Sequence, residues 1–192
     1  MRLGVLGGSF NPPHVGHVII ASDAFEALKL DKLFIVPAAA NPLKGQKTAV
    51  APEARLEMVQ MTFGGDTRFE VSAMEIERGG LSYTVDTLET LAGQNPGAEL
   101  VLLLGKDAMK SIDQWKRPDR IRELARLAVL ARGDDDLSLP DGVETVTTRR
   151  IDVSSTEIRE RVSRNMPIKG FVADSVEKFI STAKLYAGNG NA

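Results

Sequence analysis

The sequence predicts an α/β fold in which a doubly wound, mainly parallel sheet carries helices on both faces. Short apolar segments of strand length alternate along the chain with longer segments whose apolar residues recur at helical spacing. A glycine-rich turn follows the first strand, and the run LVLLL at 100–104 lacks alternation, as expected when both faces of a strand are covered. The 192 residues fit a single compact domain, 1–192.

Four elements are expected in the first third of the chain. The strand 2–6 ends at a glycine pair, and the helix 14–30 follows because its apolar residues recur at a spacing near 3.6. The apolar segment 31–36 predicts a second strand, which Pro37 ends. Beyond a loop rich in proline, alanine and lysine, Pro52 suits the first turn of a helix that continues to the next glycine pair.

The remaining elements continue the alternation. They are strands at 68–76, 99–104, 127–131 and 143–147, helices at 84–92, 107–112 and 119–124, and a helical C-terminal part from about residue 154 with helices that begin at Ser155 and Asp174. Strands joined by helices are parallel, and ligands of such sheets bind beyond the carboxyl ends of the strands.

Composition excludes several classes of protein. The chain has no cysteine, which removes disulfides, thiolate nucleophiles and cysteine-rich zinc sites and fits a reducing compartment. A net charge of −2 offers no global positive field, so no nucleic-acid partner is expected. The longest apolar stretch is far shorter than the roughly 20 residues that span a bilayer, and glycines interrupt the N-terminus too early for a signal peptide. We therefore expect a cytoplasmic protein with no membrane partner.

The stretch GGSFNPPHVGH at 7–17 contains both histidines of the chain. A glycine-rich turn that leads into a helix presents backbone N–H groups and the positive end of the helix dipole, which suit a phosphate. The spacing matches neither the G-x-G-x-x-G pattern nor the P-loop pattern, so both common nucleotide-binding interpretations are disfavoured. His14 and His17 lie three positions apart at the expected helix start and share one face.

The histidine pair permits three interpretations. Zinc binding is disfavoured because the stretch lacks the glutamate of H-E-x-x-H and the chain has no third histidine. Local capping or packing would require no ligand. Two imidazoles on one face of a helix N-terminus, which can bind an anion, favour the third interpretation. In that interpretation the histidines contact a phosphate as hydrogen-bond donors.

Two separate segments carry a family resemblance. GGSFNPPHVGH resembles the signature of the nucleotidylyltransferases of the H-x-G-H type, and SSTEIR at 154–159 resembles that family's second signature, with Val153 where isoleucine is usual. Ser154 and Glu157 also suit a capping box, which is compatible with that assignment. Within this group the whole chain is similar to the bacterial nicotinate mononucleotide adenylyltransferases. The resemblance implies that the predicted sheet is Rossmann-like.

The resemblance also implies a reaction and a site. It implies transfer of AMP from ATP to nicotinate mononucleotide, which gives nicotinate adenine dinucleotide and pyrophosphate in NAD biosynthesis. It implies Mg²⁺ carried with ATP rather than by a metal site of the protein. Separately from the resemblance, a homodimer is the candidate assembly. Carried over position by position, it implies catalytic His14, His17, Lys44 and Arg159; ATP-binding Gly7, Gly8, Ser9, Phe10, Gly105, Asp107, Arg132, Ser155 and Thr156; and nicotinate mononucleotide-binding Tyr83, Thr84 and Trp115.

Two middle segments extend the resemblance. GGLSYTVDTL at 79–88 resembles the family's start of the helix that faces the nicotinate ring, with a plain helix start capped by Ser82 or Thr84 as the alternative. GKDAMKSIDQW at 105–115 resembles the family's glycine-x-aspartate segment followed by tryptophan, although Lys106 stands where relatives often have a small residue.

Some features depart from the family pattern or leave alternatives open. Lys44 is retained, but 41–43 read Asn-Pro-Leu where the family more often has Pro-Pro-His. Trp115, the only tryptophan, stands among polar residues, which disfavours a core role. An adenylyltransferase acting on nicotinamide mononucleotide or phosphopantetheine, and a non-catalytic nucleotide-binding module, remain alternatives. The complete set of basic and hydroxyl residues favours an enzyme, and an NAD-dependent oxidoreductase would need a glycine fingerprint that is missing.

Overall fold

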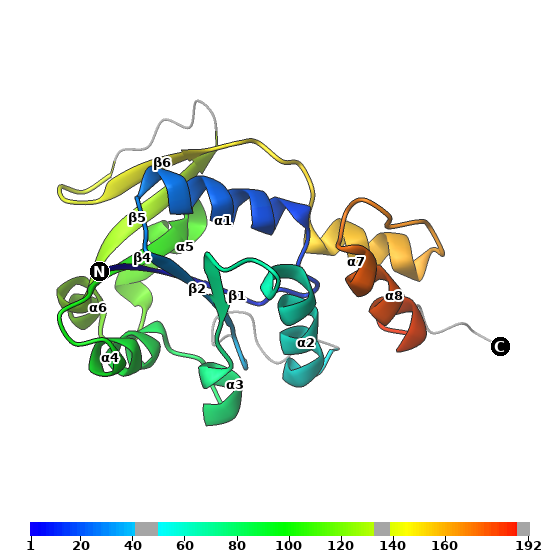
Figure 1. Ribbon diagram of the computed structural model, residues 1–192, viewed down its shortest axis with the longest axis horizontal. Coiled ribbons are helices and arrows are strands. Elements are labelled where there is room, and N and C mark those ends of the chain that lie inside the picture. Colours follow the sequence, from blue (N-terminus) through cyan, green and yellow to red (C-terminus); the bar gives the residue numbers. More distant parts are fainter. Residues whose placement is uncertain (41–49, 133–138, 188–192) are drawn as a thin grey trace.

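The structure is a computed structural model that describes residues 1–40, 50–132 and 139–187 (Figure 1). One six-stranded sheet has the order β3-β2-β1-β4-β5-β6, and each neighbouring pair is parallel. The strands are β1 (Arg2–Gly8), β2 (Lys32–Pro37), β3 (Phe69–Val71), β4 (Glu99–Gly105), β5 (Ala125–Arg132) and β6 (Glu144–Thr148). The expected doubly wound, Rossmann-like α/β fold is confirmed.

Helices cover both faces of this sheet. Apolar residues of α4, α5 and α6 pack on one face, and those of α1 and α2 pack on the other. The helices are α1 (Val15–Ala27), α2 (Pro52–Phe63), α3 (Met74–Arg78), α4 (Thr84–Gln94), α5 (Lys106–Lys110), a 3-10 helix η1 (Ile112–Gln114), α6 (Pro118–Leu124), α7 (Ser155–Ser163) and α8 (Asp174–Thr182). In the described part of the chain, no helix has the length and apolar character needed to cross a membrane.

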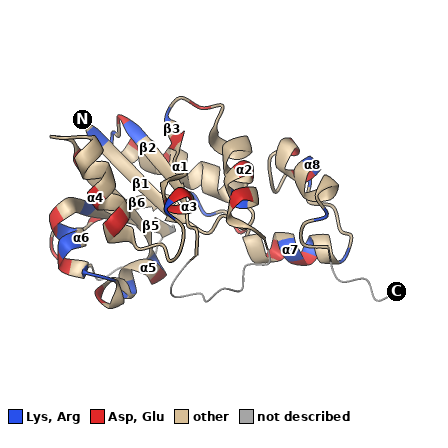
Figure 2. Ribbon diagram, turned by 90° about the horizontal axis from the view of Figure 1, so that it is seen from below, with Lys and Arg blue, Asp and Glu red and all other residues tan. Residues whose placement is uncertain are grey.

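The C-terminal helices α7 and α8 lie at one end of the molecule, beyond α2, in both ribbon views (Figures 1 and 2). Figure 2 shows charges of both signs along α7. The apolar sides of the two helices meet α2 in a buried cluster to which Met58, Ile158, Val176 and Ile180 belong. Helix α2 therefore ties the C-terminal part of the chain to the sheet.

The expected strand 68–76 is wrong over its second half. The N–H of Ser72 makes the last contact with the neighbouring strand, donating to the carbonyl oxygen of Ile35 over 3.0 Å, and the chain then turns into α3. In this helix the buried carboxylate of Glu75 accepts a hydrogen bond of 2.5 Å from the hydroxyl of Thr87 on α4. That contact with a distant residue favours a helix where the local sequence suggested a strand.

Helix α1 is shorter than the expected 14–30. Lys29 has φ 49°, in the left-handed region, and the N–H of Leu30 donates to the carbonyl oxygen of Phe25 over 3.1 Å, a bond that closes the helix end. Apolar spacing continues past this point because Leu28 and Leu30 are buried in the core after the helix has ended.

The sheet topology brings particular residues to one edge. Successive strands run outward from β1 in one direction as β2 and β3, and in the other as β4, β5 and β6, so the order reverses between β1 and β4. In parallel strands, the carboxyl ends lie at the same edge, and ligands bind where the order reverses. Gly8 ends β1 and Gly105 ends β4, so both lie at this position.

Candidate active site

The two histidines begin helix α1. His14 is the N-cap residue and His17 stands in the first turn, with ring centroids 3.8 Å apart. The backbone N–H of His14 donates to Nδ1 of His17 over 3.1 Å. Because Nδ1 is an acceptor, the hydrogen of a neutral His17 imidazole resides on Nε2.

Burial and the nearby charge of His14 lower the pKa of His17 to about 3 from its ordinary value of 6.5. The ring of His17 also lies 5.0 Å from the ring of Phe10, centroid to centroid. His17 is therefore neutral near pH 7 and suits the role of a hydrogen-bond donor. The local capping alternative is confirmed, since Nδ1 of His17 accepts a hydrogen bond from the N-cap N–H.

Two glycines of the first signature leave room for aromatic rings. A Cβ on Gly8 would lie 3.0 Å from an atom of the Phe10 ring, and a Cβ on Gly16 would lie 3.0 Å from Nδ1 of His14. Phe10 itself adopts φ 45°, an uncommon conformation for a bulky residue, with its side chain buried. The turn is thus packed closely around its rings.

The second signature lies directly against the first. The hydroxyl of Ser155 donates to the carbonyl oxygen of Pro12 over 2.8 Å, and Nη1 of Arg159 donates to the carbonyl oxygen of Asn11 over 2.8 Å. Nη2 of Arg159 donates to the hydroxyl of Thr156 over 3.0 Å. The structure therefore brings together His14, His17, Ser155, Thr156 and Arg159, as the sequence predicted.

Helix α7 begins with the expected cap. The hydroxyl of Ser154 accepts a hydrogen bond of 3.1 Å from the N–H of Glu157, which is the first half of a capping box. A cap at this position leaves Ser155 and Arg159 free to face the first signature.

Sequence reasoning missed two residues that hold this turn. The hydroxyl of Tyr186, near the end of the described chain, donates to Oδ1 of Asn11 over 2.6 Å. Burial raises the pKa of this hydroxyl, against the opposing charges of Arg159 and Arg55. Arg55, on α2, donates to the carbonyl oxygen of Ser9 over 2.8 Å. Arg55 stands three and four residues before the apolar Met58 and Val59 in the expected helix. A charged residue on the apolar side of a helix is the local signal that could have drawn attention to Arg55.

The segment expected to face a pyridine ring lies at the start of α4. Tyr83 is the N-cap residue, and the ammonium of Lys116 lies 4.4 Å from its ring centroid. Neither Ser82 nor Thr84 caps the helix, so that alternative is wrong; the hydroxyl of Ser82 instead accepts a hydrogen bond of 2.9 Å from the N–H of Ala39. A serine held by another loop is not available to cap its own helix.

Trp115 follows the 3-10 helix η1 and is less exposed than its polar neighbours suggested. Its ring packs against the same buried cluster as Tyr83. The indole N–H is buried and has no hydrogen-bond partner among the described residues. Trp115 and Tyr83 therefore lie in one layer on the face of the sheet that α4 covers.

The remaining expected residues lie at the ends of strands or outside the described parts. Gly105 and Asp107 are exposed at the junction of β4 and α5, and Arg132 is the last residue of β5. These positions share the carboxyl edge of the sheet with Gly7, Gly8, Ser9 and Phe10. Lys44 lies outside the described residues.

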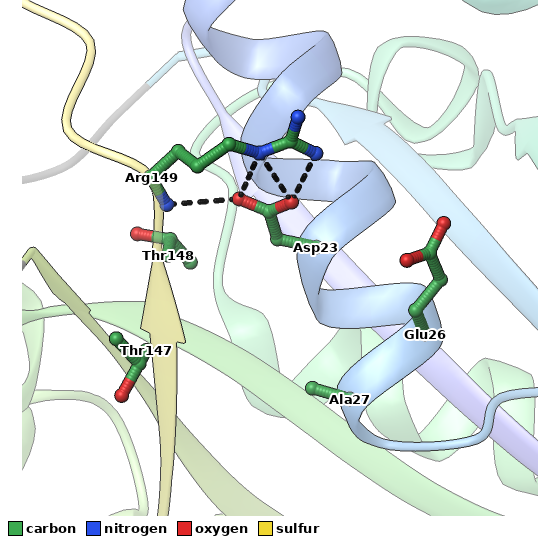
Figure 3. A pocket seen from close by; sticks show the side chains of 6 residues that line it. All are labelled: Asp23, Glu26, Ala27, Thr147, Thr148 and Arg149. Atoms are coloured by element: carbon green, nitrogen blue, oxygen red, sulfur yellow. Dashed lines mark hydrogen bonds and ion pairs between the residues drawn. The ribbon is translucent and has the colours of Figure 1, made fainter.

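A separate hollow of about 330 Å³ lies between α1 and β6 (Figure 3). Its main feature is an ion pair in which the guanidinium and the backbone N–H of Arg149 donate to Asp23, and these bonds lower the pKa of Asp23. The hollow contains none of the expected site residues. The ion pair fixes the chain after β6, which leads to the second signature.

Known proteins resemble this chain over nearly its whole length. A sequence model of the cytidylyltransferase-like family matches residues 5–161. A protein of Gemmatimonas aurantiaca described as a probable nicotinate-nucleotide adenylyltransferase is 46% identical, over 97% of this chain and 92% of that protein. A Thermus thermophilus protein with the same description is 40% identical, over 97% of this chain and 100% of that protein.

Solved structures extend the likeness in fold. The nicotinic acid mononucleotide adenylyltransferase of Plasmodium falciparum complexed with NaAD has a TM-score of 0.77 and 16% identity, over 96% of this chain and 97% of that chain. The same enzyme complexed with APC has a TM-score of 0.76. The Gemmatimonas and Thermus proteins each align with 97% of this chain, and both are described as probable nicotinate-nucleotide adenylyltransferases. The chain therefore belongs to the cytidylyltransferase-like family and, within it, to the nicotinate-nucleotide adenylyltransferases.

Proposed function

We propose that this chain transfers the adenylyl group of ATP to nicotinate mononucleotide and forms nicotinate adenine dinucleotide and pyrophosphate in NAD biosynthesis. Its relatives share nearly the full length and are named for this activity. One observation carries the proposal: the side chains of Ser155 and Arg159 on α7 donate hydrogen bonds to the main chain just before the histidine pair. These contacts support the proposal that both signatures bind the phosphates of ATP at a single site.

The reaction needs placement more than proton transfer. The nucleophile is a phosphate oxygen of the mononucleotide, which is already anionic near neutral pH. It forms a bond to the α-phosphorus of ATP while the bond to pyrophosphate breaks. The enzyme has to hold two repelling anions in line and stabilise the charge on the α-phosphate and on the leaving group. A general base is not required to create this nucleophile.

The cluster around the first signature suits that task. Neutral His17 offers an Nε2–H donor whose orientation is set by the hydrogen bond at Nδ1. The guanidinium of Arg159 lies near the N-terminus of α7, where positive charge and free N–H groups both attract an anion. His14 begins the neighbouring helix α1, so two helix N-termini meet at the proposed phosphate position.

We assign each of the other expected residues to one of the two substrates, ATP or nicotinate mononucleotide. The proposed ATP contacts, besides the histidines, are Gly7, Gly8, Ser9, Phe10, Gly105, Asp107, Arg132, Ser155 and Thr156, with Lys44 on the triphosphate. For nicotinate mononucleotide we propose Tyr83 and Thr84, through the start of α4, and the ring of Trp115. Trp115 and Tyr83 border the same layer of the fold, which supports a shared pyridine site.

Enzymes of this kind generally use a divalent metal together with ATP. We propose that this ion is Mg²⁺ and that it enters bound to the triphosphate. Mg²⁺ keeps several water ligands and binds phosphate oxygens in such sites, so it needs few protein ligands. In the ranges that the structure describes, no group of three or more His, Cys, Asp or Glu residues could hold a metal ion.

A single assay tests the function. The protein is incubated with ATP and Mg²⁺ and with nicotinate mononucleotide, nicotinamide mononucleotide or phosphopantetheine, and pyrophosphate release is followed. We expect the highest kcat/KM with nicotinate mononucleotide. A preference for either other acceptor would replace the proposed substrate, and no release with any acceptor would favour a non-catalytic module. The homodimer, the cytoplasmic location and the single domain over 1–192 stay predictions; light scattering after gel filtration tests the homodimer.

A further inference from the structure

We propose that Arg55 is a positioning residue that couples the two substrate segments of the site; this inference rests on the function proposed above. Arg55 lies in the first part of α2 and is only 1% exposed. Nη1 donates to the carbonyl oxygen of Ser9 over 2.8 Å, and Nη2 donates to the carbonyl oxygen of Ala39 over 2.8 Å. One planar guanidinium thus joins the turn after β1 to the segment after β2.

The bond to Ser9 orients a peptide group of the phosphate turn. In a trans peptide, the carbonyl of Ser9 and the N–H of Phe10 point in opposite directions. A guanidinium that holds the carbonyl on the buried side therefore directs the Phe10 N–H to the other side. Phe10 has φ 45°, which is costly for a bulky residue and persists only where surrounding contacts hold it. Arg55 supplies such a contact.

The bond to Ala39 reaches the pyridine segment. The N–H of Ala39 donates to the hydroxyl of Ser82 over 2.9 Å, and Ser82 directly precedes Tyr83. A second bond, 2.8 Å from the N–H of Ser82 to the carbonyl oxygen of Ala40, fixes the same place. A continuous chain of contacts therefore runs from the phosphate turn through Arg55 to the start of α4.

The chemistry of this link requires arginine. A charged donor makes a stronger hydrogen bond than a neutral one, and both acceptors are main-chain carbonyls. The two terminal nitrogens of a guanidinium lie in a rigid fork, whereas a lysine ammonium is a single point on a flexible stem. Lysine at this position keeps the charge and loses the simultaneous contact with both segments. Arg55→Lys therefore separates the link from the charge.

The test compares Arg55→Lys with Arg126→Met, which removes an arginine whose side chain is 64% exposed near the amino end of β5. Thermal unfolding is measured with kcat and with KM for ATP and for nicotinate mononucleotide. We expect Arg55→Lys to lower kcat/KM about 100-fold, the scale of a small misplacement of reacting groups, and to raise KM for both substrates. Arg126→Met is expected to match the wild type.

Ser82→Ala breaks the second link without altering a buried charge, and it keeps the inference testable if Arg55→Lys does not fold. We expect it to raise KM for nicotinate mononucleotide about fivefold, the usual scale of one hydrogen bond, with KM for ATP nearly unchanged. In the double variant the combined fold-change in KM for nicotinate mononucleotide should be smaller than the product of the two single fold-changes, because both substitutions act through Ala39.

Several results would overturn the inference. These are wild-type kinetics in a folded Arg55→Lys variant, a loss that the unfolded fraction alone explains, an unchanged KM for nicotinate mononucleotide in Ser82→Ala, or fully independent effects in the double variant. An inactive wild type would overturn the proposed function, and the inference with it. Activity of the wild type together with an unaffected Arg55→Lys would overturn the inference alone.

Discussion

The guanidinium of Arg159 donates to the carbonyl oxygen of Asn11 over 2.8 Å, a contact between residues 148 positions apart in the sequence. The hydroxyl of Ser155 makes a parallel contact with Pro12. Helix α7 is itself anchored on α2 through buried apolar residues. The candidate site therefore exists only once the C-terminal helices have packed against the turn after β1.

Arg159→Ala is expected to lower kcat/KM by about 100-fold or more, because it removes both a positive charge at the proposed phosphate position and the bond that holds Asn11. The rate of pyrophosphate release, measured at saturating ATP and at varied concentrations of nicotinate mononucleotide, gives this kcat/KM. Arg164→Ala, at the exposed end of the same helix, is the matched control and should stay within about twofold of the wild type, the range of surface substitutions. Equal activities of the two variants would contradict the assignment.

His17→Ala should fold and lose about two orders of magnitude in turnover, since it removes one preorganised donor. His17→Gln restores an amide N–H donor of similar reach and should recover part of the loss. Circular dichroism and steady-state kinetics on both variants test this. Turnover near that of the wild type in His17→Ala would show that the imidazole does not contact the reacting phosphates.

The lowered pKa of His17 predicts a dependence of stability on pH. The pKa is about 3 in the folded chain and 6.5 ordinarily, so the unfolded chain binds a proton between these values and the folded chain does not. The contribution of His17 is complete above about pH 6.5 and is lost as the pH falls toward 3. The slope for one proton is at most about 1.4 kcal/mol per pH unit.

Urea unfolding of the wild type and of His17→Gln at pH values from about 7 down to about 4, which cover most of this range, measures the effect. The free energy of unfolding of the wild type should decline relative to that of the variant by about 1 kcal/mol per pH unit. Parallel curves for the two proteins would mean that His17 titrates alike in both states. Kinetics near neutral pH should show no inflection from His17, which stays neutral there.

The parts of this protein that follow local rules could be predicted from the sequence. The unbroken apolar run in β4 reports burial on both faces, and the spacing of His14 and His17 places both rings at one helix terminus. Neighbours in sequence set these features. The meeting of the two signatures was also expected, but only because family resemblance linked them.

Other features depend on contacts that leave no local trace. Arg55 and Tyr186 act on residues 46 and 175 positions away, so their own surroundings in the sequence do not reveal the acceptors. The same reason explains the error at α3, where the bond between Glu75 and Thr87 overrides a strand-like pattern. The sequence therefore indicated the residues that we propose as substrate contacts better than the residues that hold the turn after β1 in place.

Tyr186→Phe tests one of these supporting contacts. It removes the hydroxyl that donates to Asn11 and keeps the ring, so an amide oxygen loses its partner. We expect the free energy of unfolding to fall by about 1 kcal/mol and kcat/KM to fall about threefold to tenfold. Tyr83→Phe is the comparison. It retains the packing of the ring at the proposed pyridine site, and we expect any change in KM to be confined to KM for nicotinate mononucleotide. An unchanged melting temperature in Tyr186→Phe would mean that the bond contributes nothing to stability.

Gly16→Ala separates helix stability from the placement of a histidine. A Cβ at this position would lie 3.0 Å from Nδ1 of His14 and 3.4 Å from a methyl of Ile151, so the imidazole has to shift by a few tenths of an ångström. Alanine also favours a helix by about 1 kcal/mol over glycine, which offsets the crowding. We therefore expect a nearly unchanged melting temperature and a turnover about tenfold lower, because placement of the reacting groups is steeply sensitive to distance.

Gly93→Ala is the matched control for that substitution. Gly93 lies in α4, and no described atom outside its own helix backbone and chain neighbours lies within 4 Å of the place that a Cβ would take, so alanine gains helix stability without crowding. We expect its free energy of unfolding to increase by about 0.5 to 1 kcal/mol, so that its melting temperature rises, while turnover stays at the wild-type value. If Gly16→Ala behaved in the same way as Gly93→Ala, with higher stability and full turnover, the position of the His14 ring would not matter to the reaction.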